Sequence, residues 1–293
     1  MFNPNSGKGR GRSLVEPVLR ELESAGLPYA HGVTGRPGDE GALTEAAVAK
    51  GFRKLVAVGG DGTWSNVGNA ILRTGAPVSL GLVPAGTGCD LAKSLGIPGR
   101  DVAACVRVVA AGCTRTIDVG RIEDRHFLNV AGFGFDIAVI EDSWNVRWLG
   151  GDLLYLYCAL RQMYSFPGFE VEIEADGLAP GRRDLLMLIV ANARVFGGGF
   201  RIAPEADLAD GHVDAFAFGN VGLARRLQLM LRLMKGTHAA DPGVSSGRAR
   251  SLLLRFEQPP VYETDGEWNR ARSREVRIES VPAALRVLVP AES

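Results

Sequence analysis

The sequence predicts an α/β domain followed by a β-rich domain. Up to about Thr114, short apolar runs alternate with helical patterns, which is typical of a parallel sheet covered by helices. After that point the apolar runs are short and separated by Gly, Pro and Asp, which is typical of antiparallel strands. A length of 293 residues also favours two domains over one.

The first domain is expected to alternate strands with helices. The strand-like runs are Tyr29 to Val33, Lys54 to Val58 and Val78 to Val83. The helical patterns are Arg12 to Ser24, Asp39 to Lys50, Asn66 to Arg73 and Asp101 to Ala111. A strand expected before Asn3 has almost no residues, so either the fold tolerates a stub or the natural start lies upstream. Ligands of such sheets bind at the carboxyl ends of the strands, so the loops there are candidate sites.

The second domain is expected to be an antiparallel sheet with two helices. Its strand-like runs are Thr114 to Ile122, Phe127 to Ala131, Phe169 to Glu174, Leu185 to Ala191, Val213 to Phe218 and Leu252 to Phe256. Its helical patterns are Trp144 to Ser165, which is rich in aromatic residues, and Leu223 to Lys235.

The helix from Leu223 to Lys235 is amphipathic and basic. One face carries Leu223, Leu227, Met230, Leu231 and Met234, with Arg225, Arg226, Arg232 and Lys235 off it. This face and the aromatic segment are compatible with contact to a membrane surface. Packing against the domain core is the expectation we prefer for both.

The composition excludes several classes of protein. Hydrophobic content of 46% and charged content of 23% are typical of a globular chain. Because 33 basic residues balance 33 acidic ones, no overall field recruits nucleic acid or an anionic membrane, and any recognition of anions must be local. No apolar run approaches the ~18 residues of a transmembrane helix, and the four cysteines show no disulfide or zinc spacing. We expect a cytoplasmic protein.

Three glycine-rich loops occur in the α/β half. They are NPNSGKG at Asn3 to Gly9, GGDGT at Gly59 to Thr63, and PAGTGCD at Pro84 to Asp90. Glycine lets backbone N–H groups approach a phosphate closely, and a following helix adds its positive end. The P-loop and dinucleotide-binding spacings are both missing. Any one loop alone is compatible with a tight strand-to-helix turn.

Asp61 makes a nucleotide site the better interpretation. A carboxylate beside polyphosphate repels it unless a cation lies between them, and Mg²⁺ binds through one or two carboxylates together with phosphate oxygens. Asp61 is therefore a candidate Mg²⁺ ligand. The alternative is that Asp61 caps a helix beginning near Trp64.

The chain resembles the diacylglycerol kinase catalytic-domain family, which includes sphingosine kinases. Matching motifs occur in order over nearly the whole sequence. They are NPNSG, Thr34 in VTGRPGD, GGDGT with the polar stretch to Asn66, PAGTGCD, NVAGFGFD (Asn129 to Asp136), the segment from Ala191 to Asp214, and TDGEW (Thr264 to Trp268). GGDGT alone is shared with NAD kinases, whereas the ordered set is specific.

The resemblance implies an α/β domain related to that of NAD kinase and phosphofructokinase, then a β-sandwich-like domain, with ATP between them. We assign residues 1–120 to a nucleotide-binding domain, 121–271 to a lipid-substrate domain, and Arg272 to Ser293 to a segment returning to the first. Nucleotide contacts are implied for Asn3, Pro4, Asn5, Ser6, Gly7, Thr34, Gly59, Gly60, Asp61, Gly62, Thr63, Asn66, Gly86 and Thr87.

The resemblance also implies catalytic and metal-binding roles. Glu267 matches a general base, Asp265 is its neighbour in the motif, and Asp207, Asp210 and the carbonyl of His212 match a structural metal site. A carboxylate that accepts the proton of a lipid hydroxyl suits this chemistry. The competing interpretations are a plain Asp-Gly hairpin turn for TDGEW and a solvated acidic turn for the Asp207 segment.

The expected activity is ATP- and Mg²⁺-dependent phosphorylation of a diacylglycerol-like or sphingoid lipid, with transient membrane contact. Cys89 stands where the family usually has asparagine. A thiol lacks the paired donor and acceptor of the asparagine side-chain amide, so any contact that this amide makes in the family is weakened or replaced here. The alternatives are an NAD kinase-like enzyme and a catalytically weak protein that binds nucleotide or lipid. A homodimer is left open.

Overall fold

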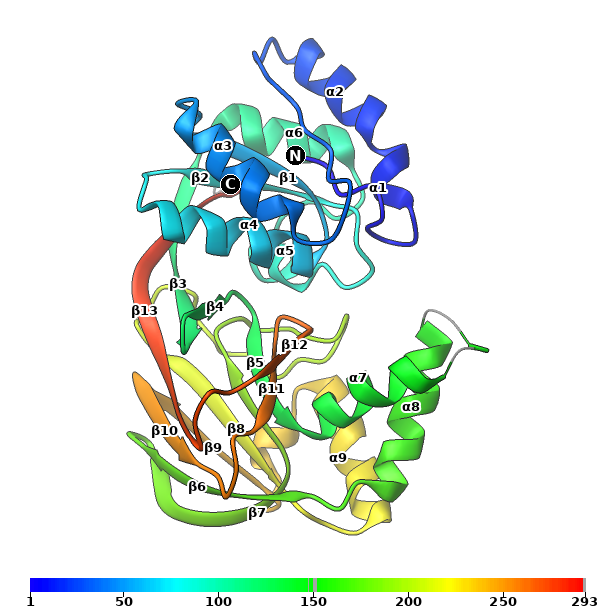
Figure 1. Ribbon diagram of the computed structural model, residues 1–293, viewed down its shortest axis with the longest axis vertical. Helices are drawn as coiled ribbons and strands as arrows, with labels where there is room; N and C mark the ends of the chain where they lie inside the picture. The colour runs from blue at the N-terminus through cyan, green and yellow to red at the C-terminus, as the bar shows by residue number, and fades with distance from the viewer. Residues whose placement is uncertain (147, 150–151, 292–293) are drawn as a thin grey trace.

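The computed structural model describes residues 1–146, 148–149 and 152–291, and it has two domains. Residues 1–111 form most of one domain, drawn from blue through cyan to blue-green in Figure 1. The second domain lies below it in that view, and two long strands, β3 (Thr114–Ile122) and β13 (Glu275–Leu288), run between them. The predicted α/β domain followed by a β-sandwich-like domain is confirmed.

The first domain is built on two parallel strands, β1 (Lys54–Gly59) and β2 (Ser79–Pro84), whose buried apolar residues match the predicted runs. Helices pack on the sheet in pairs, α2 with α6 and α3 with α4, giving three layers. The helices are α1 (Arg10–Ser13), α2 (Val15–Ser24), α3 (Asp39–Ala49), α4 (Asp61–Thr74), α5 (Asp90–Ser94) and α6 (Val102–Ala111).

The predicted strand from Tyr29 to Val33 is wrong, because only Val33 forms a bridge. Its neighbour is the stub of residues 1–3, where Phe2 donates to the Gly32 carbonyl at 2.9 Å and accepts from the Thr34 amide at 2.9 Å. On its other side the stub bonds β1, with the Asn3 amide 3.0 Å from the Val58 carbonyl. A stub this short can pair with only one residue of the Tyr29 to Val33 segment, so no strand forms there. The stub still places the Asn3 loop beside β1.

The second domain is mainly antiparallel, with a core of apolar side chains separate from that of the first domain. Besides β3 and β13, its strands are β4 (Arg125–Phe127), β5 (Val130–Gly134), β6 (Phe169–Ala175), β7 (Leu178–Ala191), β8 (Val213–Gly219), β9 (Val244–Ala249), β10 (Ser251–Arg255), β11 (Val261–Thr264) and β12 (Glu267–Arg270). The predicted strand Phe127 to Ala131 is displaced, since it straddles the end of β4 and the start of β5.

Three helices cover this domain on one side: α7 (Phe135–Asn145), α8 (Asp152–Ser165) and α9 (Leu223–Lys235). The prediction of one helix from Trp144 to Ser165 is wrong, because α7 ends at Asn145 and α8 is a separate helix. Residues 147, 150 and 151 of that prediction lie outside the described residues. No helix among the described residues is long and apolar enough to cross a membrane.

Strand β13 belongs to both domains. Its first residues pair with β10, and its last pair in parallel with β2, Arg286 opposite Ser79 and Val287 opposite Leu80. Val276 and Ile278 lie in the second core, whereas Leu285 and Val287 lie in the first. The returning segment that we propose from Arg272 onward therefore reaches the first domain through the end of β13; its residues 292–293 lie outside the described residues.

Candidate active site

The three glycine loops meet at the carboxyl ends of the strands. Gly60 and Gly86 touch backbone to backbone, and a Cβ on Gly86 would lie 2.6 Å from the Gly60 Cα. A Cβ on Gly7 would lie 1.9 Å from the Ala85 carbonyl oxygen. No side chain fits at these contacts, so the glycines let three loops pack into one surface.

A pocket of about 650 Å³ lies between this surface and the second domain. Glu267 lines this pocket. So do eight of the predicted nucleotide-binding residues: Asn3, Asn5, Ser6, Thr34, Gly60, Gly62, Thr63 and Asn66. The other six are outside the lining. Pro4, Gly7, Gly59 and Asp61 belong to loops that line the pocket, whereas Gly86 and Thr87 belong to the PAGTGCD loop, which contributes no lining residue. Arg36, Pro37, Gly38, Glu40 and Arg125 complete it.

Asn3 forms hydrogen bonds with three other residues that line the pocket. Its Nδ2 donates to Glu40 Oε1 at 3.2 Å and to Thr63 Oγ1 at 3.0 Å, while its Oδ1 accepts from the Asn5 amide at 3.1 Å. Glu40 is buried and also accepts from the Gly38 amide at 3.2 Å. Sequence reasoning missed Glu40, because an acid in the first turn of a helix ordinarily serves the helix dipole.

Asp61 lies in the first turn of α4, but it does not cap that helix. Its Oδ1 accepts from the backbone amides of Asp90 at 2.8 Å and Leu91 at 3.1 Å, at the start of α5, and from Asn129 Nδ2 at 3.3 Å. The alternative that Asp61 caps the helix in which it lies is therefore wrong, because its carboxylate bonds the amides at the start of α5. Asp61 fastens the PAGTGCD loop to the GGDGT loop, and Asn129 brings in the second domain.

The other oxygen of Asp61 is available to a cation. Oδ2 accepts no hydrogen bond from the described residues, and it lies beside Gly88, as does Asp90 Oδ2. Burial, and next the charge of Asp90, raise the pKa of Asp61. Because Asp90 Oδ2 accepts from the Gly198 amide, Asp61 Oδ2 is the oxygen of this pair left to a hard cation shared with phosphate. The donor set is thus compatible with Mg²⁺ at Asp61.

Asp90 also connects the domains. Its Oδ2 accepts from the Gly198 amide at 2.8 Å, and Lys93 Nζ donates both to Asp90 Oδ1 at 2.9 Å and to the Gly198 carbonyl at 2.7 Å. Asp90 is buried, whereas the Lys93 side chain is 45% exposed, so only the Asp90 side of these charge-assisted bonds is shielded from solvent. They hold a second-domain glycine loop against the PAGTGCD loop.

The TDGEW segment is a hairpin turn that presents carboxylates on two sides. Asp265 and Gly266 link β11 to β12 with φ of 51° and 86°, the left-handed pair that a two-residue hairpin loop needs. The hairpin interpretation is correct, and it coexists with a role in the site. The first residue of β12, Glu267, faces the pocket.

Glu267 is held from both domains by side chains. Its Oε1 accepts from Asn66 Nδ2 at 3.2 Å, and its Oε2 pairs with Arg125 Nη2 at 2.8 Å. The carboxylate is partly exposed, at 39% of its side-chain surface. Arg125 was missed because it lies in a hairpin with no motif, where an arginine is ordinarily solvated.

Asp265 is half-buried and bonded to backbone. Its carboxylate accepts from the amides of Leu128 at 2.8 Å, Asn129 at 2.8 Å and Val130 at 3.2 Å. Burial raises the pKa of Asp265 to about 6, against these bonds, which lower it. Asp265 fixes the start of β5, and through Asn129 it acts on Asp61, so the geometry makes it a positioning residue.

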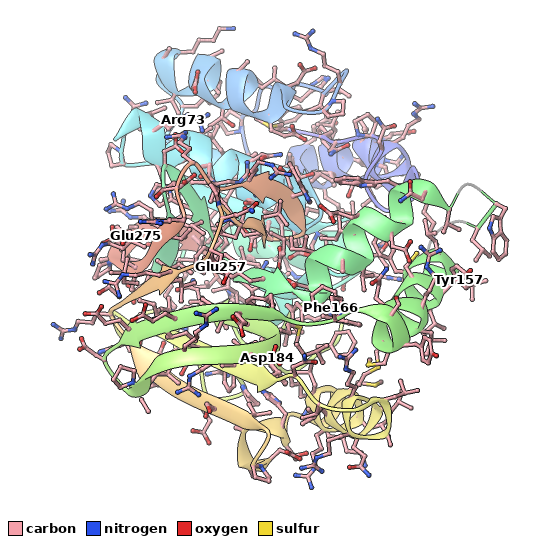
Figure 2. The ribbon with its side chains drawn as sticks, turned by 60° about the horizontal axis from the view of Figure 1, so that its bottom comes forward. Arg73, Tyr157, Phe166, Asp184, Glu257 and Glu275 are labelled. Atoms are coloured by element: carbon pink, nitrogen blue, oxygen red, sulfur yellow. The ribbon has the colours of Figure 1, made fainter. Side chains whose placement is uncertain are left out.

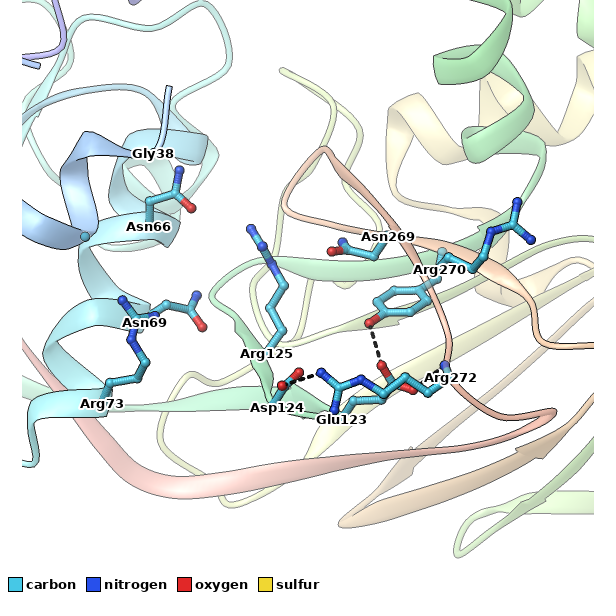
Figure 3. A pocket seen from close by; sticks show the side chains of 12 residues that line it. Gly38, Asn66, Asn69, Arg73, Glu123, Asp124, Arg125, Asn269, Arg270 and Arg272 are labelled. Atoms are coloured by element: carbon cyan, nitrogen blue, oxygen red, sulfur yellow. Dashed lines mark hydrogen bonds and ion pairs between the residues drawn. The ribbon is translucent and has the colours of Figure 1, made fainter. Parts of the chain in front are cut away.

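A second, smaller pocket of about 340 Å³ adjoins the first (Figure 3). The two share Gly38, Asn66 and Arg125, and Arg125 stands between α4 and the β12 strand. Its arginines are largely neutralised, since Arg272 pairs with Asp124 at 2.5 Å and Arg73 with Glu45 at 3.1 Å. It extends the polar cleft beyond Glu267.

The predicted structural metal site is arranged differently. Asp207 pairs with Arg115 at 2.5 Å, Asp210 pairs with Arg248 at 3.2 Å, and the described residues hold no cluster of three or more His, Cys, Asp or Glu ligands. The His212 amide donates to Asp210 Oδ1 at 3.0 Å. As arranged, Asp207 and Asp210 are each paired with an arginine, and a metal site formed by Asp207, Asp210 and the His212 carbonyl stays a prediction.

Cys89 stands at the N-cap of α5 with a left-handed backbone, φ 53° and ψ 46°. Asparagine adopts this conformation more readily than other side chains except glycine, which explains the motif's asparagine by backbone geometry. Burial raises the pKa of the Cys89 thiol to about 11, so it is neutral.

Two family models together cover most of the chain. The diacylglycerol kinase catalytic domain matches residues 1–122, and the YegS C-terminal NAD kinase beta sandwich-like domain matches residues 129–289. A diacylglycerol kinase of Mycobacterium tuberculosis is 33% identical, over 99% of this chain and 94% of its own. One from Bacillus subtilis is 28% identical, over 92% of this chain and 88% of its own.

Solved structures share the fold. A diacylglycerol kinase from Bacillus anthracis superposes with a TM-score of 0.74 at 19% identity, covering 98% of this chain and 94% of its own. An NAD kinase from Archaeoglobus fulgidus in complex with ATP gives 0.54 at 12%, covering 98% and 91%. With both domains matched in order and a relative at 33% identity over nearly its full length, the chain belongs to the diacylglycerol kinase catalytic-domain family and is an enzyme of the kinase class.

Proposed function

We propose that the protein is an ATP- and Mg²⁺-dependent lipid kinase that transfers the γ-phosphate to a hydroxyl of a diacylglycerol-like or sphingoid lipid. The observation that carries this proposal is that Glu267 faces the same interdomain pocket as the NPNSGKG and GGDGT loops. A carboxylate and a surface suited to phosphate thus meet in one space of about 650 Å³.

The nucleotide would lie along the first-domain wall. Its phosphates would rest on the packed glycine loops and the start of α4, where N–H groups and the helix dipole favour negative charge. Asn3, Thr34 and Thr63 offer hydrogen-bonding groups on the same wall. When bound, Mg²⁺ would be held by Asp61 Oδ2 and would neutralise charge on the phosphates.

Glu267 would act on the acceptor. As the lipid oxygen forms its bond to the γ-phosphorus, the bond from that phosphorus to the β–γ bridging oxygen breaks and ADP leaves. Glu267 accepts the hydroxyl proton, and Asn66 and Arg125 keep its carboxylate at the boundary of the two pockets. Asp265 and Asn129 hold the strand that borders this space.

An NAD kinase-like activity is the second candidate, because the fold of an NAD kinase superposes over both domains. The two activities differ in acceptor. Purified protein is incubated with Mg²⁺, radiolabelled ATP and either a total bacterial lipid extract or NAD. We expect label in an extracted lipid and none in NAD. Label in NAD alone would overturn the proposal in favour of the second candidate.

A further inference from the structure

The outer surface of α8 and α9 is apolar and uncovered. Its exposed side chains are Leu153, Tyr155, Leu156, Tyr157, Leu160 and Tyr164 on α8 and Leu223, Leu227, Leu231 and Met234 on α9. We call these residues the α8–α9 surface. Leu231 is 60% exposed and Tyr164 80%. The two helices pack against each other, and Tyr157 lies at the outer edge of the molecule in Figure 2. Large apolar side chains exposed on two helices that pack together ordinarily mark an interaction site.

The orientation of α9 keeps this face outward. Its buried face is Arg226, Leu229 and Leu233, not the leucine and methionine stripe that we expected to pack on the core. Arg226 donates to the carbonyls of Val221, Met163 and Phe166 at 2.8 to 2.9 Å and to Asn220 Oδ1 at 2.8 Å. Four hydrogen bonds to a buried guanidinium fix the rotation of the helix, so the stripe is held in solvent.

The positive charge of α9 favours a partner that is negatively charged. The helix contains four basic residues and no acidic one. Arg225 and Arg232 both pair with buried Asp241, at 2.6 and 3.3 Å, which leaves excess positive charge beside the apolar stripe. A second copy of this basic face would be repelled, whereas anionic headgroups over hydrocarbon match both features. Tyrosines on α8 suit the same boundary, since one end of each ring is apolar and the other polar.

We propose that the α8–α9 surface seats the enzyme in the interface of an anionic bilayer. The seat is joined to the active site through α7. Trp144, at the end of α7, lies 5.8 Å from Trp268, ring centroid to centroid, and Trp268 Nε1 donates to Glu141 Oε1 at 2.9 Å. Trp268 follows Glu267 in β12. The significance of the seat for catalysis rests on the proposed lipid acceptor, but binding to a bilayer does not.

The test is vesicle co-sedimentation without nucleotide, using phosphatidylcholine vesicles with and without phosphatidylglycerol. We expect binding to the anionic vesicles that weakens with added salt. Leu227→Glu together with Leu231→Glu removes two inserted side chains, and we expect on the order of 100-fold weaker binding. The matched control is Phe52→Glu, an exposed apolar residue of the first domain, which we expect to bind as wild type.

Equal vesicle binding by the double variant and the wild type overturns the proposal. So does a wild-type dimer in solution that the double variant converts to monomer, because the surface would then cover a second copy. Phosphorylation of a detergent-dispersed lipid should be unchanged in the double variant, and phosphorylation of the same lipid in vesicles should fall. If the wild type labels no lipid at all, the proposed function fails, while vesicle binding still decides the seat.

Discussion

The GGDGT loop and the TDGEW hairpin use carboxylates in opposite ways. In the loop, one oxygen of Asp61 is committed to two backbone amides and Asn129, and the other faces the space beside Gly88. In the hairpin the tasks are divided, since Asp265 takes three backbone amides and Glu267 faces the pocket with side-chain partners only.

The difference shows how rigidity and reactivity are assigned. A carboxylate bonded to backbone amides is fixed in place and serves as a structural joint or an immobile metal ligand. A carboxylate held by Asn66 and Arg125 exchanges partners when those side chains move, as a proton acceptor must. The two regions are connected, because Asp265 bonds the Asn129 amide and Asn129 bonds Asp61.

The largest expected effect is at Glu267, the carboxylate of the hairpin that faces the pocket. Glu267→Gln keeps the bond from Asn66 but removes the proton acceptor, so the turnover number should fall by about 10²- to 10⁴-fold. ATP binding, followed by calorimetry, should change little. Glu257→Gln, an exposed acid on the second domain, is the matched control. Turnover above about one tenth of wild type would exclude Glu267 as the base.

Asp265, the carboxylate of the hairpin that is bonded to backbone amides, should matter to stability. Asp265→Ala leaves three buried backbone amides without an acceptor, and the free energy of unfolding should fall by about 3–5 kcal/mol. The measurement is urea denaturation. Asp176→Ala, in the exposed Asp-Gly turn between β6 and β7, should have little effect. Similar losses for both variants would mean that Asp265 serves only the turn.

A third carboxylate sharpens the comparison, because no side chain among the described residues donates a hydrogen bond to it. Asp136 at the start of α7 has two buried oxygens without a hydrogen-bond partner, near the buried Glu263. Burial raises the pKa of Asp136 to about 7 from 3.8, and burial followed by Asp136 raises that of Glu263. The folded protein therefore holds a proton that the unfolded chain releases.

Stability from Asp136 should be lost as pH rises from about 4 to about 7, since the folded state binds more protons in that window. Asp136→Asn removes this loss, so its advantage over wild type should grow between pH 4 and pH 8, by at most about 4 kcal/mol. Denaturation at both pH values measures it, with Asp176→Asn as control. An advantage independent of pH would show that Asp136 is ionised throughout.

The smallest effect is expected at Cys89 in the first region. At position 89 the backbone is left-handed, with φ 53°, and asparagine tolerates this conformation better than cysteine does. Cys89→Asn should therefore stabilise the protein by about 1 kcal/mol. Cys89→Ser, which changes the thiol without that tolerance, should not. Thermal unfolding compares them. Equal stabilisation by both would point to loss of the thiol as the cause.

The sequence predicted the parts of the fold that depend on local pattern. The runs that became β1 and β2 are continuous and apolar, and α9 has a clear helical period. Tyr29 to Val33 has the same pattern, but its pairing depends on a partner of three residues. The break between α7 and α8 also left no clear periodic signal.

The site was predicted where motifs carry it, as at Asn3, Asp61 and Glu267. Long-range partners were not predictable, because no local pattern tells that Asp61 bonds the start of α5 or that Arg125 reaches Glu267. The face of α9 that packs is chosen by Arg226, whose bonds to the end of α8 join residues about 60 positions apart. Periodicity alone would bury the leucines.

The most direct test compares the two carboxylates in one experiment. Wild type, Asp61→Asn and Glu267→Gln are assayed for transfer of label from ATP to lipid, and for ATP binding with and without Mg²⁺. We expect both variants to lose transfer, with Mg²⁺ still strengthening ATP binding in Glu267→Gln and no longer doing so in Asp61→Asn. Transfer by Asp61→Asn near the wild-type rate, or Mg²⁺-dependent binding by it, would contradict the assignment of metal to Asp61.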